Sequence, residues 1–286
     1  MPRKLFCEIS PLTYKISTFK CCAVRAFKDL FSRERFAKTK QQEPLPVIVY
    51  KHNSLIRRKL GNTQMELQEN KAVNLALSSS KVNGIIIRPG ETFSFWQLVG
   101  STTAKKGYKD GVTIANGQTR AGIGGGLCQF TNLIHWMVLH TPLTITEHHH
   151  HDGIDLFPDY NRQVPFGTGT SILYNYLDYR FKNETDVTYQ LVIYVTETHL
   201  CGEIRATSQL PVKYHIKTEN EHFVRVGDAV YRRGQVYRTC VDKITGNELS
   251  CEMIRDNNAR VMYDTAHLAV TEVSVEKDVN NDIILL

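Results

Sequence analysis

Apolar residues recur at helical spacing in three stretches of the chain, and each recurrence predicts a helix. The first stretch lies within residues 13–40, where one helical face carries Ile16, Phe19, Ala23, Phe27, Leu30 and Phe31. The second helix is expected over residues 63–80, because its first residues form a Thr-x-x-Glu capping box. The third begins at Cys128, and a Thr-Pro pair at residues 141–142 ends it.

Runs of β-branched and aromatic residues, separated by turn signals, predict strands. We expect them at residues 47–50, 85–87, 92–95, 112–115, 118–120, 143–146, 171–181 and 187–198, the last two in one antiparallel sheet. The pair Asn116-Gly117 is a two-residue hairpin signal. Residues 208–264 are typical of short strands, with turns near Gly227 and Gly246.

Together these elements predict an α+β fold. It has an antiparallel β-sheet core, a helix carrying Cys128 at its N-terminus, N-terminal helices and a small β-rich C-terminal appendage. We divide the chain into a basic helical N-terminal segment (1–60), a core domain (61–205), the appendage (206–270) and a flexible tail (271–286). With 286 residues, 42% of them hydrophobic, the chain can bury a sizeable core.

Positive charge is concentrated in the N-terminal segment. The net charge of the chain is +6, and residues 1–60 hold 14 Lys and Arg against 4 Asp and Glu. We expect the first helix to pack its apolar stripe on the core; the alternative is that this basic amphipathic helix lies on an anionic membrane surface. Nucleic acid is not expected as a partner, because no recognition motif accompanies the charge.

The expected location of the protein follows from its N-terminus and its cysteines. No run of 18 apolar residues appears, and the first 22 residues lack the pattern of a secretory signal. Seven cysteines, an odd number, suit reduced thiols better than a disulfide framework. We therefore expect a cytoplasmic protein, with peripheral contact at the inner membrane face as the alternative that the basic helix allows.

The main candidate for chemistry is a stretch in which glycines precede a cysteine. Gly124, Gly125 and Gly126 permit turns that a Cβ forbids, and Cys128 lies in the first turn of the predicted helix. Unpaired N–H groups and the positive end of the helix dipole favour a thiolate there, which is the nucleophilic form. The alternative is that Cys128 is a small buried apolar residue and the glycines form only a tight turn.

Four histidines, at residues 148–151, follow the predicted strand 143–146. On a strand His149 and His151 share one face, and either would give Cys128 the partner that a Cys-His nucleophilic pair requires. A metal site is the alternative. However, at most two of the four histidines can meet one ion, and no metal-binding motif supplies further ligands. We therefore predict no metal and no other cofactor.

These motifs resemble the VanW family, which is associated with glycopeptide (vancomycin) resistance gene clusters of bacteria. The resemblance covers about residues 85–183 and rests on residues 89–95, 124–129, 147–151 and 157–159, with Arg162 and residues 165–167. The region after Ser208 is similar to members with a longer tail. Members often have Glu-Arg-His-x-His at residues 147–151, which implies that His149 and His151 are the family positions. Many relatives carry secretion signals and cell-wall modules, which implies a role at peptidoglycan; this chain departs from them by having no such signal.

The first functional interpretation is a hydrolase or acyl transferase that acts on a peptidoglycan peptide or its precursor. Cys128 would attack a carbonyl, and His149 or His151 would accept and return its proton. Asp159 would orient the imidazole, and Gln129 would stabilise the oxyanion through its amide or its backbone N–H.

The second interpretation is a non-catalytic binding or scaffolding protein. Here the glycine loop, Trp96 and Arg162 line a groove for a muropeptide. Core packing is the alternative role of Trp96, and a local salt bridge or a turn cap is the alternative role of Asp159 and Arg162. The residues alone leave both interpretations open.

Overall fold

The computed structural model describes residues 5–57, 65–115, 118–150, 153–158 and 164–272. Its helices are α1 (Pro11–Phe31), α2 (Met65–Val82), α3 (Phe95–Val99) and α4 (Cys128–Val138), with 3-10 turns η1 (Phe6–Glu8) and η2 (Ala104–Lys106). Its strands are β1 (Arg35–Phe36), β2 (Val47–Leu55), β3 (Ile85–Ile87), β4 (Glu91–Ser94), β5 (Asp110–Ala115), β6 (Gln118–Ile123), β7 (Thr144–Glu147), β8 (Ile154–Asp155), β9 (Arg180–Lys182), β10 (Tyr189–Val195), β11 (His199–Ala206), β12 (Val212–Val226), β13 (Ala229–Asp242), β14 (Glu248–Val261) and β15 (Val270–Glu272). None of the helices within these ranges combines the length and the apolarity that a bilayer-spanning segment needs.

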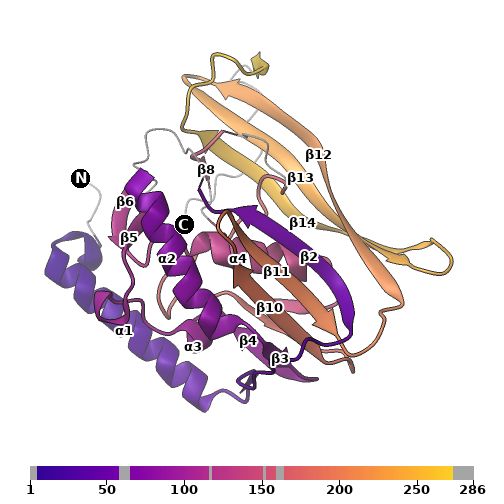
Figure 1. Ribbon diagram of the computed structural model, residues 1–286. Coiled ribbons are helices and arrows are strands. Elements are labelled where there is room, and N and C mark those ends of the chain that lie inside the picture. Colours follow the sequence, from indigo (N-terminus) through magenta and orange to yellow (C-terminus); the bar gives the residue numbers. More distant parts are fainter. Residues whose placement is uncertain (1–4, 58–64, 116–117, 151–152, 159–163, 273–286) are drawn as a thin grey trace.

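The core contains two four-stranded sheets, in the orders β1-β4-β9-β7 and β2-β11-β10-β3, and the predicted α+β class is confirmed (Figure 1). Helix α2 packs against β10, and α4 packs against β11 and β2. The close approach of α4 depends on Gly202 of β11, because a Cβ there would lie 2.6 Å from Met137 Cε. The sheet therefore fixes α4, and with it the position of Cys128 at the start of that helix.

The C-terminal sheet has the order β15-β12-β13-β14-β8, and its three main strands are 15, 14 and 14 residues long. The expectation of short strands in this region was wrong. The turns at Gly227 and Gly246 lie where they were expected, both with positive φ. Charged residues interrupt the apolar runs between these turns, but the alternation of buried and partly buried positions continues along β13.

The two-residue strand β8 joins the C-terminal sheet to the core. It follows the histidine run and pairs in parallel with β14, Ile154 with Arg260 and Asp155 with Val261. The Asp155 carboxylate accepts hydrogen bonds from Arg232 and Tyr263 of the appendage. Core and appendage are thus connected through β8 at the edge of β14, as well as through the chain between β11 and β12.

Two further sequence expectations differ from the structure. Strands β3 and β4 flank the expected turn but lie in different sheets, and Phe95 begins α3. Residues 171–181 contain a strand only at their end, β9, which is not in the sheet of β10. In the rest of the segment the backbone N–H of Ser171 donates to the carbonyl of His149, and Leu173 pairs with Leu177 across a turn. Strands β1 and β2, within the N-terminal 60 residues, pair with β4 and β11 of the core.

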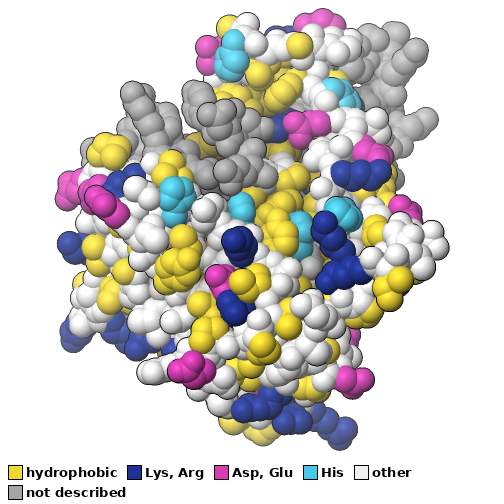
Figure 2. Space-filling view, turned by 45° about the vertical axis from the view of Figure 1, so that its right-hand side comes forward, with side chains coloured by type: hydrophobic (Ala, Val, Ile, Leu, Met, Phe, Trp, Pro, Cys, Tyr) yellow, Lys and Arg dark blue, Asp and Glu magenta, His cyan; other side chains and the backbone are white. Residues whose placement is uncertain are grey.

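Helix α1 lies along an outer edge of the molecule, and the expectation that its apolar stripe packs on the core was wrong (Figure 1). No residue of α1 is buried, and its large apolar side chains are exposed. The helix is attached to the core by polar groups: Arg25 pairs with Glu147, and Asp29 pairs with Arg180. Figure 2 shows Lys and Arg side chains along the left and lower rim of the molecule.

Candidate functional site

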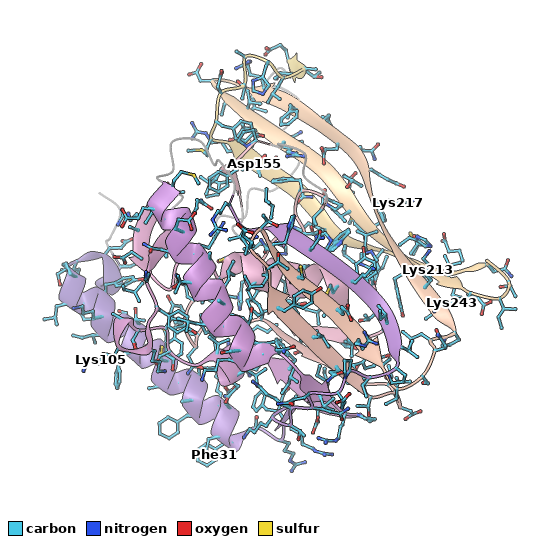
Figure 3. All side chains as sticks on the ribbon, viewed as in Figure 1. Phe31, Lys105, Asp155, Lys213, Lys217 and Lys243 are labelled. Atoms are coloured by element: carbon cyan, nitrogen blue, oxygen red, sulfur yellow. The ribbon has the colours of Figure 1, made fainter. Side chains whose placement is uncertain are left out.

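A cavity of about 1290 Å³ lies between the core and the C-terminal appendage. Its walls come from β2, α2, the loop before α4, the first turns of α4, residues 164–174 and β14, and α1 borders it through Tyr14 and Thr18. Figure 3 shows Asp155, another residue of the wall, between the core sheets and the C-terminal sheet. Binding sites for small molecules are commonly 300–1,000 Å³, so this cavity has room for a peptide-sized ligand.

The glycine loop at residues 124–126 forms one wall of the cavity, and its glycines are required by close packing. Gly124 and Gly126 have φ of +77° and +91°, a conformation that side chains rarely adopt. A Cβ on Gly125 would clash with the backbone of Gly111 in β5. All three backbone N–H groups already donate to backbone carbonyls, so the loop supplies shape rather than open donors.

Asn74 of α2 holds this loop in place, and sequence reasoning missed it. Its side chain is fully buried; it donates to the carbonyls of Lys109 and Gly125, both at 2.9 Å, and accepts from the Lys109 N–H at 2.8 Å. A buried amide with three hydrogen bonds to two loops fixes their separation. The signal in the sequence was a polar residue, Asn74, on the helix face that the apolar residues predict to be buried.

Cys128 lines the cavity, and its surroundings favour the thiol over the thiolate. Burial raises the pKa of Cys128, and hydrogen bonds from the backbone N–H groups of Ile172 and of Cys128 itself lower it by less. The N–H groups of the next residues are also engaged, since Gln129 donates to Gly126 and Phe130 to Leu127. Burial thus outweighs the hydrogen bonds at the start of the helix in setting this pKa, and the catalytic role of Cys128 stays a prediction.

A network of side chains fixes the first turn of α4 against residues 168–172. Asn132 Oδ1 accepts hydrogen bonds from the N–H of Thr170 at 2.6 Å and from its hydroxyl at 2.8 Å. The hydroxyls of Thr170 and Thr131 lie 2.5 Å apart, and Thr131 donates to the carbonyl of Cys128 at 3.2 Å. The position of Cys128 is thus fixed from both sides.

Although β7 ends at Glu147, the described histidines keep the alternation of a strand: His149 lies on the side of Glu147, and the rings of His148 and His150 lie together on the other side. His149 Nε2 lies 2.9 Å from Glu147 Oε1, in the group that anchors α1 through Arg25. His150 lines the cavity together with Cys128. His151 lies outside the described residues.

Behind His150, two further imidazoles continue into the core. The ring centroids of His150 and His148 are 4.0 Å apart, and those of His148 and His135 are also 4.0 Å apart. Burial lowers the pKa of His135 well below its usual range, and the neighbouring histidines lower it further. Within the described ranges, no group of three or more His, Cys, Asp or Glu side chains has an arrangement that could hold a metal ion.

Two other predicted binding residues line the cavity but are committed to the fold. The Gln129 amide nitrogen donates to Ser54 Oγ and to the Leu55 carbonyl, both at 2.8 Å, which ties α4 to β2. The Trp96 ring is only 5% exposed, and its Nε1 donates to the Leu177 carbonyl at 3.0 Å. Asp159 and Arg162 lie outside the described residues.

Polar groups that the sequence did not single out complete the cavity. Gln68 Oε1, from α2, is buried and accepts no hydrogen bond from any residue that the structure describes. The charged side chains among the described lining residues are Arg57, Lys71, Arg255 and Asp155. Arg57 pairs with Glu69, and Asp155 pairs with Arg232.

Comparisons with known proteins agree with the resemblance in the motifs. The family model described as "VanW like protein" matches residues 70–205. The Vancomycin B-type resistance protein VanW of Enterococcus faecalis is 34% identical over 228 residues, which are 80% of this chain and 82% of that protein. A Bacillus subtilis protein, "Uncharacterized protein YoaR", is 32% identical over 114 residues, 39% of this chain and 35% of its own length. No solved structure matches the chain.

Proposed function

Because the chain belongs to the VanW family, and a relative that it matches over most of its length is named for vancomycin resistance, we propose that it is an accessory protein of glycopeptide resistance. Its role is to bind a peptide of peptidoglycan, or of a peptidoglycan precursor, in the cavity between core and appendage. The cavity carries this proposal, because it combines the family's glycine loop and Cys128 with a volume of about 1290 Å³.

The chemistry of the walls suits a peptide that ends in a carboxylate, such as a D-Ala-D-Ala-type terminus. Arg57, Lys71 and Arg255 line the cavity, and basic side chains are the groups that bind a carboxylate in proteins. The Gln68 carbonyl oxygen supplies an acceptor for a peptide N–H, and a buried acceptor without a donor gains most from such a bond. The glycine loop lets a backbone approach closely.

Binding is favoured over catalysis by the state of the thiol. The pKa of Cys128 is raised by burial, and the N–H groups of Gly125, Gly126 and Gln129 already have acceptors. A cysteine nucleophile at rest requires the opposite: a lowered pKa and open donors for an oxyanion.

Ligand binding is tested by calorimetric titration of the protein with a muramyl pentapeptide. Gln68→Leu removes the buried acceptor and is expected to weaken binding about tenfold, which is the value of one hydrogen bond lost in a dry site. Gln235→Leu is the matched control, since Gln235 binds Asn220 and Asp256 in the appendage and does not line the cavity. No heat of binding with the wild-type protein, or equal affinities of the two variants, would contradict the proposal.

A second candidate function is cysteine chemistry with His150, because both side chains line the same cavity. Cys128 Sγ would attack a peptide carbonyl while its proton passes to His150. The proton would then go to the leaving amine, and water or an acceptor amine would release the acyl group from the thioester. This mechanism requires that the bound ligand displaces water from the cavity and that Cys128 Sγ then lies beside the imidazole of His150.

The pH dependence of Cys128 alkylation by iodoacetamide distinguishes the two candidates, in a protein whose other six cysteines are serine. The binding function predicts that Cys128 reacts only above the usual thiol pKa range, whether or not His150 is changed to alanine. Reaction near pH 6 that is slowed by His150→Ala but not by His149→Ala would favour the catalytic candidate. His149 is the matched control because its ring binds Glu147.

A further inference from the structure

Helix α1 exposes a continuous apolar face. Leu12, Ile16, Phe19, Phe27, Leu30 and Phe31 lie on this face, which we call the outer stripe, and each is between 49% and 77% exposed. Leu5, Phe6 and Ile9 of the preceding residues are exposed as well. Figure 3 shows the Phe31 side chain directed away from the body of the molecule. Exposed apolar area of this extent marks an interaction surface in a folded protein.

The outward direction of the outer stripe is fixed by ion pairs on another face of the same helix. Both nitrogens of the Arg25 guanidinium bind the Glu147 carboxylate, at 2.6 and 2.5 Å. The Asp29 carboxylate binds Arg180 at 2.7 and 2.8 Å and also accepts from the Gln97 amide. Arg25 and Asp29 are one turn apart, so they set the rotation of the helix about its axis.

Basic side chains accompany the outer stripe. On a helix of this pitch Lys15 and Lys20 border the stripe on its two sides. The other exposed basic residues of the helix and of the residues after it, up to residue 40, are Lys28, Arg33, Arg35, Lys38 and Lys40. Within residues 5–40 the exposed acidic residues are only Glu8 and Glu34. The surface is therefore apolar along its middle and positively charged around it.

We infer that the outer stripe docks on an anionic lipid bilayer. An apolar helix face bordered by lysines is the pattern of an interfacial helix, whose rings lie below the headgroups while ammonium groups bind the phosphates. Each basic residue near an anionic surface adds to the attraction. This inference does not rest on the proposed function. It does place the bilayer beside the cavity, because Tyr14 and Thr18 of the same helix border that cavity.

Cosedimentation of the full chain with vesicles tests this inference. The protein is expected to bind vesicles of phosphatidylglycerol and phosphatidylcholine, and to bind less as the salt concentration rises or when phosphatidylglycerol is left out. The double variant Phe19→Ser, Phe27→Ser is expected to lower the partition coefficient at least about tenfold, since each ring contributes apolar area to the membrane contact.

The matched control is Ile244→Ser, Leu249→Ser, which removes exposed apolar side chains from the β13–β14 hairpin and is expected to leave vesicle binding unchanged. Both double variants change exposed residues, and circular dichroism checks their folding. Equal binding of the two variants would overturn the inference. The inference would also be overturned if the wild-type protein did not bind anionic vesicles but formed dimers, and if Phe19→Ser, Phe27→Ser converted these dimers to monomers. The outer stripe would then contact a second copy of the chain.

Discussion

Helices α1 and α4 have similar apolar periodicity but opposite environments. Eight residues of α4 are buried, among them Phe130, Leu133 and Met137, and they pack against the sheet that contains β11. No residue of α1 is buried, although its apolar residues are as large. Periodicity thus shows that a helix has an apolar face, and other groups decide what that face contacts.

Polar side chains decide what the apolar face of each helix contacts, and they lie at different positions in the two helices. In α4 the polar contacts of Gln129 and Asn132 hold the N-terminal part of the helix, while its apolar residues occupy the core. In α1 the side chains that contact the core are the charged ones of Arg25 and Asp29, so the apolar stripe faces outward. Substitutions in each helix test this difference, and the losses in the free energy of unfolding that we expect from them differ by several kcal/mol.

The largest loss is expected for Phe130→Ala in α4. Phe130 is fully buried, with its ring centroid 5.5 Å from that of Phe95, and removal of a buried phenyl ring costs about 3–5 kcal/mol. Urea unfolding measures this change. Leu133→Met, which keeps the volume, should cost less than about 1.5 kcal/mol. A loss below about 1 kcal/mol for Phe130→Ala would mean that α4 is not part of the core.

A smaller but local loss is expected for Gly125→Ala in the glycine loop. The added Cβ would clash with the backbone of Gly111, which cannot move aside without disturbing β5, so we expect a loss of about 2–3 kcal/mol. Gly169→Ala is the matched control from the same cavity, because its nearest neighbour would be 3.9 Å away. Similar unfolding midpoints for both variants would show that the loop tolerates a side chain.

Local signals in the sequence were sufficient for some of the elements and for part of the site. Asn116-Gly117 marks the hairpin of β5 and β6, and the glycines before Cys128 mark the start of α4. These signals depend on the backbone preferences of one or two residues, which act whatever the rest of the chain does.

What the sequence could not show depends on contacts between distant residues. Asn74 and Gln68 are polar residues of α2 that face the interior only because the glycine loop and the cavity lie there. The two-residue strand β8 is defined only by its pairing with β14. The period-2 pattern places His148 with His150 and His149 beside Glu147, but only the assembled cavity shows that His150, and not His149, lines it together with Cys128.

An intermediate loss is expected for Asp29→Asn, which weakens the attachment of α1. The variant removes the charge of a half-buried ion pair, although Arg180 keeps Asp178 as a partner at 2.8 Å, so we expect a loss of about 1–2 kcal/mol in urea unfolding at neutral pH. The matched control is Asp228→Asn in the β12–β13 turn, which should change the stability by less than about 0.5 kcal/mol.

The difference between the wild-type protein and Asp29→Asn should also depend on pH. Burial alone would raise the pKa of Asp29, but hydrogen bonds from Arg180 and Gln97 outweigh it, so the folded pKa is lowered. A carboxyl with a lowered folded pKa stabilises the protein above its unfolded pKa of about 4, and this contribution is lost as the pH falls through the folded pKa. The two unfolding curves should therefore converge below about pH 4. A constant difference down to lower pH would show that Asp29 is not ionised in the folded protein.

The smallest effect is expected for Phe19→Ser, Phe27→Ser in α1, which should change the free energy of unfolding by less than about 0.5 kcal/mol. Phe19 and Phe27 are 75% and 64% exposed, so the folded protein loses little stability when their rings are removed. Phe130 of α4 has a ring of the same size, but that ring is buried in the core. Urea unfolding at two protein concentrations measures this. A loss above about 1.5 kcal/mol that grows with protein concentration would mean that a second copy covers the stripe in solution, since association stabilises a folded chain by mass action. A small loss independent of concentration leaves the stripe open for a surface that the purified protein lacks.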